Sequence, residues 1–215
     1  MNDPKSPPDT GPIPPSRWEL SGTGVSGYAQ RFESLLDQGE DVDGEARLAD
    51  VLAPRGARIL DAGSGIGRVA AALAARGHDV TAVEKDPDLI ARSRARFPGI
   101  PVVESDILGL SPALLEAAGR PSSYDVIALV GNVMVYLADD TEARALRTLG
   151  DVLKPQGRML VGFHPQKGPE HSRDYPLAQF QRHVVDAGLR MEQLFGTYDL
   201  APPAEDYVVA VLRLV

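Results

Sequence analysis

The strongest constraint on the fold is a regular alternation that begins after Pro54, in which short β-branched runs are each followed by apolar residues at helical spacing. Runs such as 79–84 (DVTAVE) and 124–130 (YDVIALV) are apolar on both faces, so helices must cover the strands on both sides, as in a parallel sheet. The last two runs leave no room for a helix between them and predict an antiparallel hairpin at one edge. The chain is therefore predicted to be an α/β protein with a doubly wound, mostly parallel sheet. The predicted strands are 57–62, 79–84, 101–107, 124–130, 158–164, 189–197 and 206–215.

The segments before this alternation have a different character. Six of the first fifteen residues are proline and few are apolar, so this stretch cannot bury enough surface to offset the entropy lost on ordering. Apolar residues at helical spacing then predict one helix over 25–37 and a second that ends before Pro54. The predicted parts are a disordered proline-rich tail (1–16), an N-terminal helical cap (17–54) and the α/β domain (55–215).

Capping residues mark where the helices between the strands begin. Asp86 followed by Pro87 predicts an N-cap and a first helical position. Asp139 or Asp140 is predicted to cap another helix, and apolar spacing predicts a further one over 176–187.

The composition narrows the classes of function. With 30 acidic and 22 basic residues the formal net charge is −8, which disfavours nucleic acid or an anionic membrane as a partner, since both require basic surface. The absence of cysteine excludes disulfides, thiolate nucleophiles and cysteine-based zinc sites, and no spacing of His, Asp and Glu predicts another metal site. Because the sequence has neither a long apolar run nor a signal-peptide core, the expected location is the cytoplasm. The protein is expected to be a monomer or a homodimer.

A glycine-rich turn carries the most information about a ligand. The segment 61–67 (DAGSGIG) joins a predicted strand to a predicted helix, at the sheet edge where α/β proteins bind ligands. Its spacing is G-x-G-x-G with Arg at position 68, whereas a dinucleotide-binding turn has G-x-G-x-x-G. The carboxylate of Asp61 would also repel a pyrophosphate. A cationic ligand without phosphate, such as S-adenosylmethionine, suits this turn better.

The same block resembles the first motif of the class I S-adenosylmethionine-dependent methyltransferases, of the type that acts on small molecules. The resemblance runs in order through about residues 25–215 and implies a Rossmann-like, seven-stranded sheet whose final hairpin inserts the last strand antiparallel. Gln156 departs from the family, which more often has glycine in this loop. The other matching positions are Glu84, Ser105, Asp106, Gly131, Asn132 and the segment 153–157 (LKPQG).

The resemblance implies that acids at strand ends hold the cofactor. Asp61 would face the ammonium group, Glu84 would accept hydrogen bonds from the ribose hydroxyls, and Asp106 would accept one from the adenine amino group. The glycines would leave space for the methionine portion. Further residues would contact the adenine ring and the sulfonium, and others would contact the cofactor from the cap helix. The implied cofactor-binding residues are Tyr28, Arg31, Asp61, Gly63, Gly65, Gly67, Glu84, Asp106, Ile107, Asn132 and Val133.

The reaction implied is methyl transfer to an oxygen or nitrogen of a small molecule, with S-adenosylhomocysteine as product. A sulfonium methyl is already activated, so a base is optional and the sequence assigns no catalytic residue. Tyr136, His164 and His171 are candidates for contact with the substrate. The segment 131–134 (GNVM) lacks the Asn/Asp-Pro-Pro-aromatic motif of enzymes that methylate amino groups of nucleic acids, and without cysteine the covalent route to C5 of pyrimidines is closed.

Three alternatives stay open at this point. An NAD(P)-dependent oxidoreductase on a related fold would bind a nicotinamide and not S-adenosylhomocysteine. A non-catalytic S-adenosylmethionine binder would bind the cofactor without ever transferring its methyl. An aminopropyl transferase would need the decarboxylated cofactor and a more acidic pocket.

Overall fold

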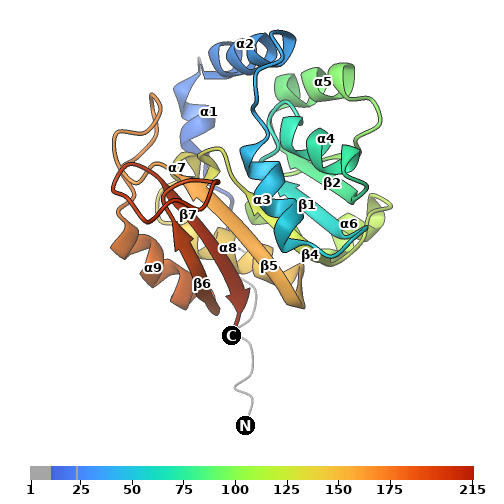
Figure 1. Cartoon of the computed structure of the whole chain (residues 1–215). Helices are drawn as coiled ribbons and strands as arrows, with labels where there is room; N and C mark the ends of the chain where they lie inside the picture. Colours follow the sequence, from blue (N-terminus) through green and yellow to red (C-terminus); the bar gives the residue numbers. More distant parts are fainter. Residues whose placement is uncertain (1–10, 23) are drawn as a thin grey trace.

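The computed structural model describes residues 11–22 and 24–215, and the first ten residues of the predicted tail lie outside it. Seven strands form one sheet in the order β3-β2-β1-β4-β5-β7-β6 (Figure 1). β7 runs antiparallel to both of its neighbours, while β1 to β5 pair in parallel, which confirms the predicted α/β fold and its C-terminal hairpin. The strands are β1 (Arg58–Ala62), β2 (Asp79–Glu84), β3 (Val102–Glu104), β4 (Tyr124–Leu129), β5 (Leu153–Phe163), β6 (Leu189–Phe195) and β7 (Val208–Leu214).

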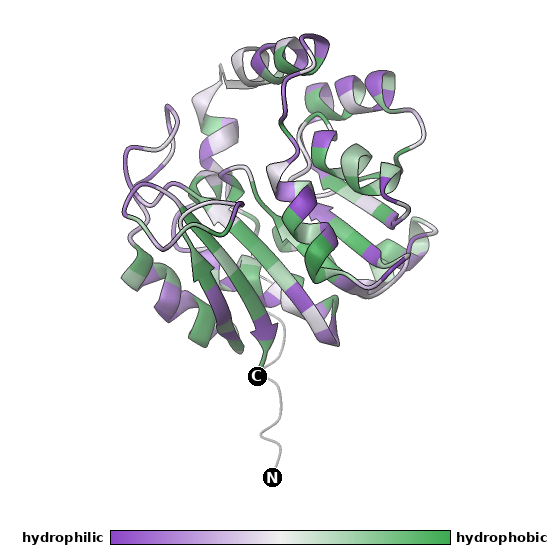
Figure 2. Cartoon of the chain, viewed as in Figure 1, coloured by the Kyte–Doolittle hydropathy of each residue, from purple (hydrophilic) through white to green (hydrophobic). Residues whose placement is uncertain are grey.

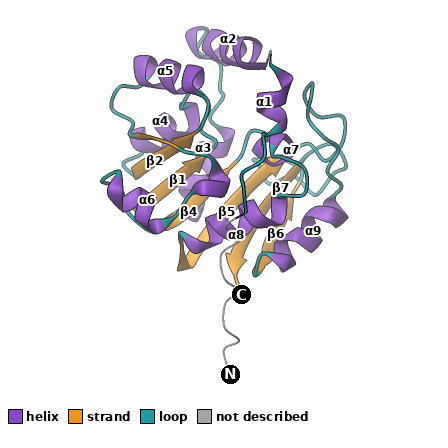
Figure 3. Ribbon diagram, turned by 180° about the vertical axis from the view of Figure 1, so that it is seen from behind, coloured by secondary structure: helices purple, strands orange, loops and turns teal. Residues whose placement is uncertain are grey.

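Helices cover both faces of the sheet, because the central strands are apolar on both sides (Figure 2). On one face α3 and α4 pack over β1 and β4, with α5 next to them over β2 and β3 (Figure 1). On the other face lie α6, α8 and α9 (Figure 3). These helices are α3 (Gly44–Leu52), α4 (Arg68–Ala75), α5 (Pro87–Arg96), α6 (Pro112–Ala117), α8 (Glu142–Asp151) and α9 (Leu177–Asp186). α3, the last part of the predicted cap, thus packs in a layer of the sheet domain.

Two N-terminal helices, α1 (Arg17–Ser21) and α2 (Gly24–Asp37), lie over the carboxyl ends of the first strands (Figures 1 and 3). Ala29 of α2 is buried with Ile66 of the glycine-rich turn and Leu89 of α5. Trp18 and Phe32 pack against this small cluster. The cap therefore covers the turn that the sequence predicted to bind a ligand.

Several local features differ from the sequence prediction. α8 begins at Glu142 with Thr141 as N-cap, and neither Asp139 nor Asp140 caps it. Asp139 instead forms an ion pair with Arg17 of α1 (2.7 Å), a distant partner that local sequence cannot reveal. β3 is shorter than predicted, because Asp106 caps the short 3₁₀ helix η1 (Ile107–Gly109). Three short helices, α1, α6 and the one-turn helix α7 (Val133–Tyr136), were not predicted from the sequence.

The segment 11–16, at the end of the predicted tail, runs along the body of the protein. Arg144 of α8 donates a hydrogen bond to the carbonyl of Gly11 (2.9 Å), and Ile13 lies beside Gly109 of η1. Among the described helices, none combines the length and the apolar character that a membrane crossing requires.

Candidate active site

The glycine-rich turn leads from β1 into α4 and packs against the end of β4. Gly63, Gly65 and Gly67 all have φ between 57° and 81°, a region that side chains disfavour. The backbone N–H groups of Gly63 and Ser64 donate to the carbonyl of Val83 in β2 (2.9 and 3.0 Å). A Cβ atom on Gly63 would lie 2.7 Å from a methyl carbon of Val133, the first residue of α7. The turn is therefore held closely between β2 and α7.

Asp61, at the end of β1, is buried and caps α4. Its Oδ2 accepts a hydrogen bond from the backbone N–H of Ala70 (3.0 Å), which satisfies a donor in the first turn of the helix. Burial raises the pKa of Asp61 to about 7, although the nearby guanidinium of Arg68 acts in the opposite direction. Its Oδ1 has no hydrogen-bond partner among the residues described. Contact between this oxygen and a ligand ammonium remains a prediction.

Glu84, at the end of β2, joins the glycine-rich turn to the loop that follows its own strand. Its Oε2 accepts from the backbone N–H of Gly65 (2.8 Å), and its Oε1 accepts from the N–H groups of Lys85 and Asp86 (2.8 and 3.0 Å). Burial raises the pKa of Glu84 against these three donors. A carboxylate has about four acceptor positions, so the three bonds leave capacity for a ligand hydroxyl.

Asp106, after β3, lies beside a lysine that the sequence analysis missed. Its Oδ1 accepts from the backbone N–H of Leu108 (2.8 Å), and its Oδ2 accepts from Lys85 Nζ (2.6 Å). Lys85 Nζ also donates to Glu19 of α1 (2.5 Å), so this ammonium connects the cap to the predicted adenine-binding acid. The feature of the sequence that could have indicated this contact is the position of Lys85 directly after Glu84. Ile107, expected against the adenine ring, is buried in the core at the start of η1.

The ends of β4 and β5 bring Asn132, Val133 and His164 together. Asn132 has φ of 74° and is the N-cap of α7. Its side-chain Oδ1 lies 2.9 Å from both the backbone nitrogen and Nδ1 of His164. The ring of Tyr207 meets the imidazole edge-to-face, with 4.6 Å between ring centroids. Tyr207 reaches this edge because β7 is antiparallel, so its first residue, Val208, pairs with Phe163 at the end of β5.

Helix α1 contacts residues that follow both β2 and β4 at this edge of the sheet. Trp18 Nε1 donates to Asp86 Oδ2 after β2 (2.9 Å), while its ring packs edge-to-face on Tyr136 of α7 at 5.4 Å. The neighbouring ion pair between Arg17 and Asp139 adds a second contact on the α7 side. The apolar character of Trp18 is visible in the sequence. Its contacts beyond the ends of β2 and β4 depend on the fold.

The remaining predicted residues form no hydrogen bond with Asp61, Glu84, Asp106, Asn132 or His164 in the described part of the chain. Tyr136 donates its hydroxyl proton to the carbonyl of Glu170 (2.8 Å). His171 is exposed, next to the carboxylate of Glu170 at 3.5 Å. Arg31 is exposed on α2, and the side chain of Tyr28 lies outside the described residues. Within the described ranges, no three acidic or histidine side chains come close enough together to hold a metal ion.

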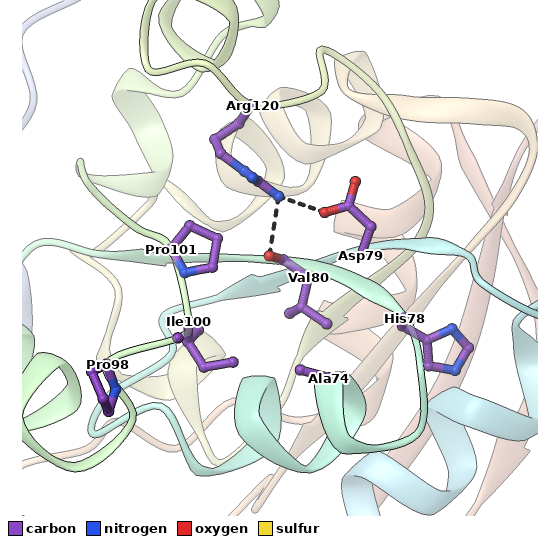
Figure 4. A pocket seen from close by; sticks show the side chains of 9 residues that line it. Ala74, His78, Asp79, Val80, Pro98, Ile100, Pro101 and Arg120 are labelled. Atoms are coloured by element: carbon purple, nitrogen blue, oxygen red, sulfur yellow. Dashed lines mark hydrogen bonds and ion pairs between the residues drawn. The ribbon is translucent and has the colours of Figure 1, made fainter.

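A pocket of about 480 Å³ lies at the opposite edge of the sheet, where β2 begins (Figure 4). Arg120 projects toward Asp79 there and donates to its carboxylate (2.6 Å) and to the carbonyl of Val80 (3.2 Å). His78, on the same rim, bonds to Asp50 (2.8 Å) and to the N–H of Ala57 (3.2 Å). Because these polar groups are satisfied within the protein, the pocket offers no reactive or unpaired group, and the carboxyl edge remains the candidate site.

Known proteins share both the sequence motif and the fold. Residues 59–157 match the family of methyltransferase domains. The crystal structure of a TehB-like SAM-dependent methyltransferase from Corynebacterium glutamicum is 34% identical and superposes with a TM-score of 0.78, over 90% of this chain and 100% of that one. The chain belongs to the class I S-adenosylmethionine-dependent methyltransferases. An uncharacterized methyltransferase of Mycobacterium bovis is 36% identical over 117 residues, 53% of this chain, and the match spans only about half (54%) of that relative's length. A ubiquinone biosynthesis O-methyltransferase of Xanthomonas euvesicatoria is 25% identical over 77% of this chain and 81% of its own.

The residues at the carboxyl edge fit the cofactor of this methyltransferase family. Asp61, Glu84 and Asp106 lie at the ends of three adjacent strands, and the turn between the first two has its glycines at positive φ. Acceptor oxygens in this arrangement match an ammonium, a ribose diol and an adenine amino group, whereas they would repel a pyrophosphate. Asp61 uses Oδ2 to accept from Ala70, which leaves Oδ1 as the acceptor that suits the ammonium in particular.

Proposed function

We propose that this protein transfers a methyl group from S-adenosylmethionine to an oxygen or nitrogen atom of a small molecule. The observation that carries the proposal is the row of carboxylates on Asp61, Glu84 and Asp106 around the glycine-rich turn, in a chain of this family. Asp61 also argues against a nicotinamide dinucleotide, whose pyrophosphate would lie beside this carboxylate.

In this proposal each side of the site has its own task. When bound, S-adenosylmethionine supplies a methyl group activated by the sulfonium. Asp61 holds the ammonium, Glu84 accepts from the ribose hydroxyls, and Asp106 accepts from the adenine amino group, with Ile107 beneath the ring. Asn132 and Val133 face the reacting end, and Tyr28 and Arg31 of α2 remain predicted contacts. Helix α1 excludes water from above, which favours a displacement that depends on alignment and desolvation.

The acceptor is expected where β5 ends and β7 begins. A hollow of about 290 Å³ there is lined by His164, Gln166, Lys167, Glu205 and Asp206, which suits a small polar molecule rather than a polymer. Tyr136, at the end of α7, and His171, in the loop after β5, are the other candidate substrate contacts. The net charge of −8 and the cap over the site also favour a small acceptor, as does the extended match to a ubiquinone biosynthesis O-methyltransferase. The expected cytoplasmic location and monomeric or homodimeric state remain predictions.

Calorimetry with S-adenosylhomocysteine and with NADH tests the cofactor. We expect S-adenosylhomocysteine to bind and NADH not to bind, and the reverse result would replace the proposal with an oxidoreductase. The small-molecule fraction of a cell extract and, separately, its RNA are then each incubated with S-adenosylmethionine labelled in its methyl group to test the reaction. Label in a small product supports the proposal. Cofactor binding without any transfer would indicate a binding protein, and transfer to RNA alone would contradict the class of acceptor.

A further inference from the structure

The contact between Asn132 and His164 fixes the position of a proton. The backbone N–H of His164 is always a donor, so the Asn132 side-chain atom that lies 2.9 Å from it must be the amide oxygen. That same oxygen lies 2.9 Å from Nδ1 of the imidazole. Since an amide oxygen can only accept, Nδ1 must carry a hydrogen.

This arrangement selects one tautomer of the neutral ring. With the hydrogen on Nδ1, the other nitrogen, Nε2, keeps its lone pair and can accept a proton. In the described part of the chain Nε2 has no hydrogen-bond partner, so it is not engaged by the fold. The edge-to-face contact with Tyr207 further restricts the ring orientation.

The imidazole also lies close to the predicted reacting end of the cofactor. Val133, adjacent to Asn132, touches the glycine-rich turn at Gly63. His164 is bonded to Asn132 on the other side and lines the hollow of about 290 Å³. Asn132, the N-cap of α7, thus connects the residue that contacts the glycine-rich turn to the imidazole, and the imidazole borders a hollow with space for an acceptor.

We propose that His164 is the general base of methyl transfer and that Asn132 positions it, so the acceptor is a hydroxyl compound, an alcohol or a phenol. This rests on the function proposed above. As the acceptor oxygen forms its bond to the methyl carbon, the carbon–sulfur bond breaks and its electron pair neutralises the sulfonium. The hydroxyl proton passes to Nε2, and the imidazolium later releases it to solvent. The products are a methyl ether and S-adenosylhomocysteine.

The charged surroundings are compatible with a neutral base near pH 7. Burial lowers the pKa of His164, while the carboxylate of Asp206 acts in the opposite direction. The other groups lining the hollow are Glu205 of the same loop, Lys167 of the loop after β5 and the uncharged Gln166. The Tyr207 hydroxyl is directed to Tyr198, and burial raises its pKa to about 12, so it stays neutral.

Nitrogen-15 NMR of the imidazoles tests the tautomer without any acceptor. The chain has four histidines, so the spectrum of His164→Gln identifies the signals of His164 by their loss. In the complex with S-adenosylhomocysteine we expect a pyrrole-type Nδ1 and a pyridine-type Nε2 at neutral pH. Asn132→Leu, which removes the acceptor, should yield a mixture of tautomers. A pyridine-type Nδ1 in the wild-type protein would overturn the proposal.

Transfer from S-adenosylmethionine carrying a carbon-13 methyl to the small-molecule extract tests catalysis. We expect the labelled methyl on oxygen, a kcat lowered about 100-fold or more in His164→Gln, and loss of the fall in rate at low pH. His183→Gln on α9 is the control and should retain wild-type rates. S-adenosylhomocysteine affinity should stay within twofold in both variants.

The outcomes separate this inference from the proposed function. If the wild-type protein does not bind S-adenosylhomocysteine, the proposed function itself is overturned. Intact binding with an unchanged rate in His164→Gln, or with the label on nitrogen or sulfur, would overturn the base and the acceptor class alone. Intact binding with no transfer at all would count against both.

Discussion

The two halves of the carboxyl edge are held in different ways. At the ends of β1, β2 and β3 the acids accept hydrogen bonds from backbone N–H groups, as Asp61 does from Ala70 and Glu84 from Gly65. At the ends of β4 and β5 the contacts join side chains, as Asn132 holds the imidazole of His164 and Trp18 packs on Tyr136, whereas on the β1–β3 side such pairs, as of Lys85 with Asp106, add to the backbone bonds. Backbone donors are independent of side-chain identity, so the first half can keep its shape while the second half varies.

This difference predicts what a substitution on each side will change. On the β1–β3 side a change should weaken cofactor binding, because the acids support both the turn and the ligand. On the β4–β5 side a change at His164 should alter turnover while cofactor binding persists. The predictions below test the first half and the helix that spans both halves.

The largest effect is expected from Gly63→Val. Its branched side chain would meet a methyl group of Val133 at a position where even a Cβ atom is only 2.7 Å away, and its φ of 75° is strained for valine. We expect calorimetry to show loss of S-adenosylhomocysteine affinity by at least about 100-fold, roughly 3 kcal/mol. The matched control is Gly77→Val, with φ of 90° and no heavy atom within 4 Å of the Cβ, so it carries the backbone strain alone. Similar losses in both variants would show that strain, not the contact with α7, limits binding.

The features that could be predicted from the sequence are those with a local cause. Asp86 and Pro87 open α5 as predicted, because an N-cap and a first-turn proline act within a few residues. The strands and the final hairpin follow from apolar periodicity. The glycine spacing and Asp61 indicated the cofactor class, because the residues that determine what a turn can bind are consecutive in the sequence.

What could not be predicted depends on partners far apart in the chain. Asp139 was expected to cap a helix, but its ion pair with Arg17 joins residues 122 positions apart. Lys85 pairs with Asp106 and Glu19, which no local pattern connects. The pairing of Asn132 with His164 likewise exists only because β4 and β5 are neighbours in the sheet.

A smaller effect is expected from Glu84→Ala. The variant removes an acceptor for the ribose hydroxyls and also releases the N–H of Gly65, so affinity for S-adenosylhomocysteine should fall by about 1–3 kcal/mol. Calorimetry measures the loss, and thermal unfolding shows how much of it is structural. Glu104→Ala, an exposed acid at the end of β3, is the control and should bind as the wild type does. An unchanged dissociation constant in Glu84→Ala would exclude the ribose contact.

The pH dependence of binding tests Asp61. With its pKa raised to about 7, the carboxyl is mostly protonated at pH 6 and mostly ionised at pH 8. Only the ionised form attracts an ammonium, so S-adenosylhomocysteine should bind about tenfold more tightly at pH 8 than at pH 6. Methylthioadenosine, which lacks the amino-acid portion, should show no such rise, and Asp61→Asn should abolish it. An equal rise for both ligands would assign the titration to another group.

The same shift affects stability with the opposite sign. The folded-state pKa of Asp61 lies above its ordinary value of 3.8, so folding favours the protonated carboxyl. The stabilising contribution is complete below about pH 4 and is lost as the pH rises toward 7. Urea unfolding of the ligand-free protein should therefore show a steeper fall in stability over this range in the wild type than in Asp61→Asn.

The smallest effect is expected from Trp18→Phe, which tests whether α1 spans the two halves. Phenylalanine keeps an aromatic ring against Tyr136 but removes the hydrogen bond from the indole nitrogen to Asp86. A hydrogen bond of about 1 kcal/mol predicts release of S-adenosylhomocysteine about fivefold faster, measured by stopped flow. Arg17→Ala, which breaks the ion pair with Asp139 on the other side, should accelerate release by less, and only at low salt.

Arg158→Ala is the control for these two variants, because its ion pair with Glu192 joins β5 to β6 away from α1. If α1 covers the cofactor, release should accelerate when either of its attachments is broken and should stay unchanged in this control. Faster release in Trp18→Phe alone would mean that α1 belongs to the β2 side and does not connect the halves. Unchanged release in both would show that the cofactor leaves by a path that α1 does not cover, and the helix would then stabilise the cap without controlling access.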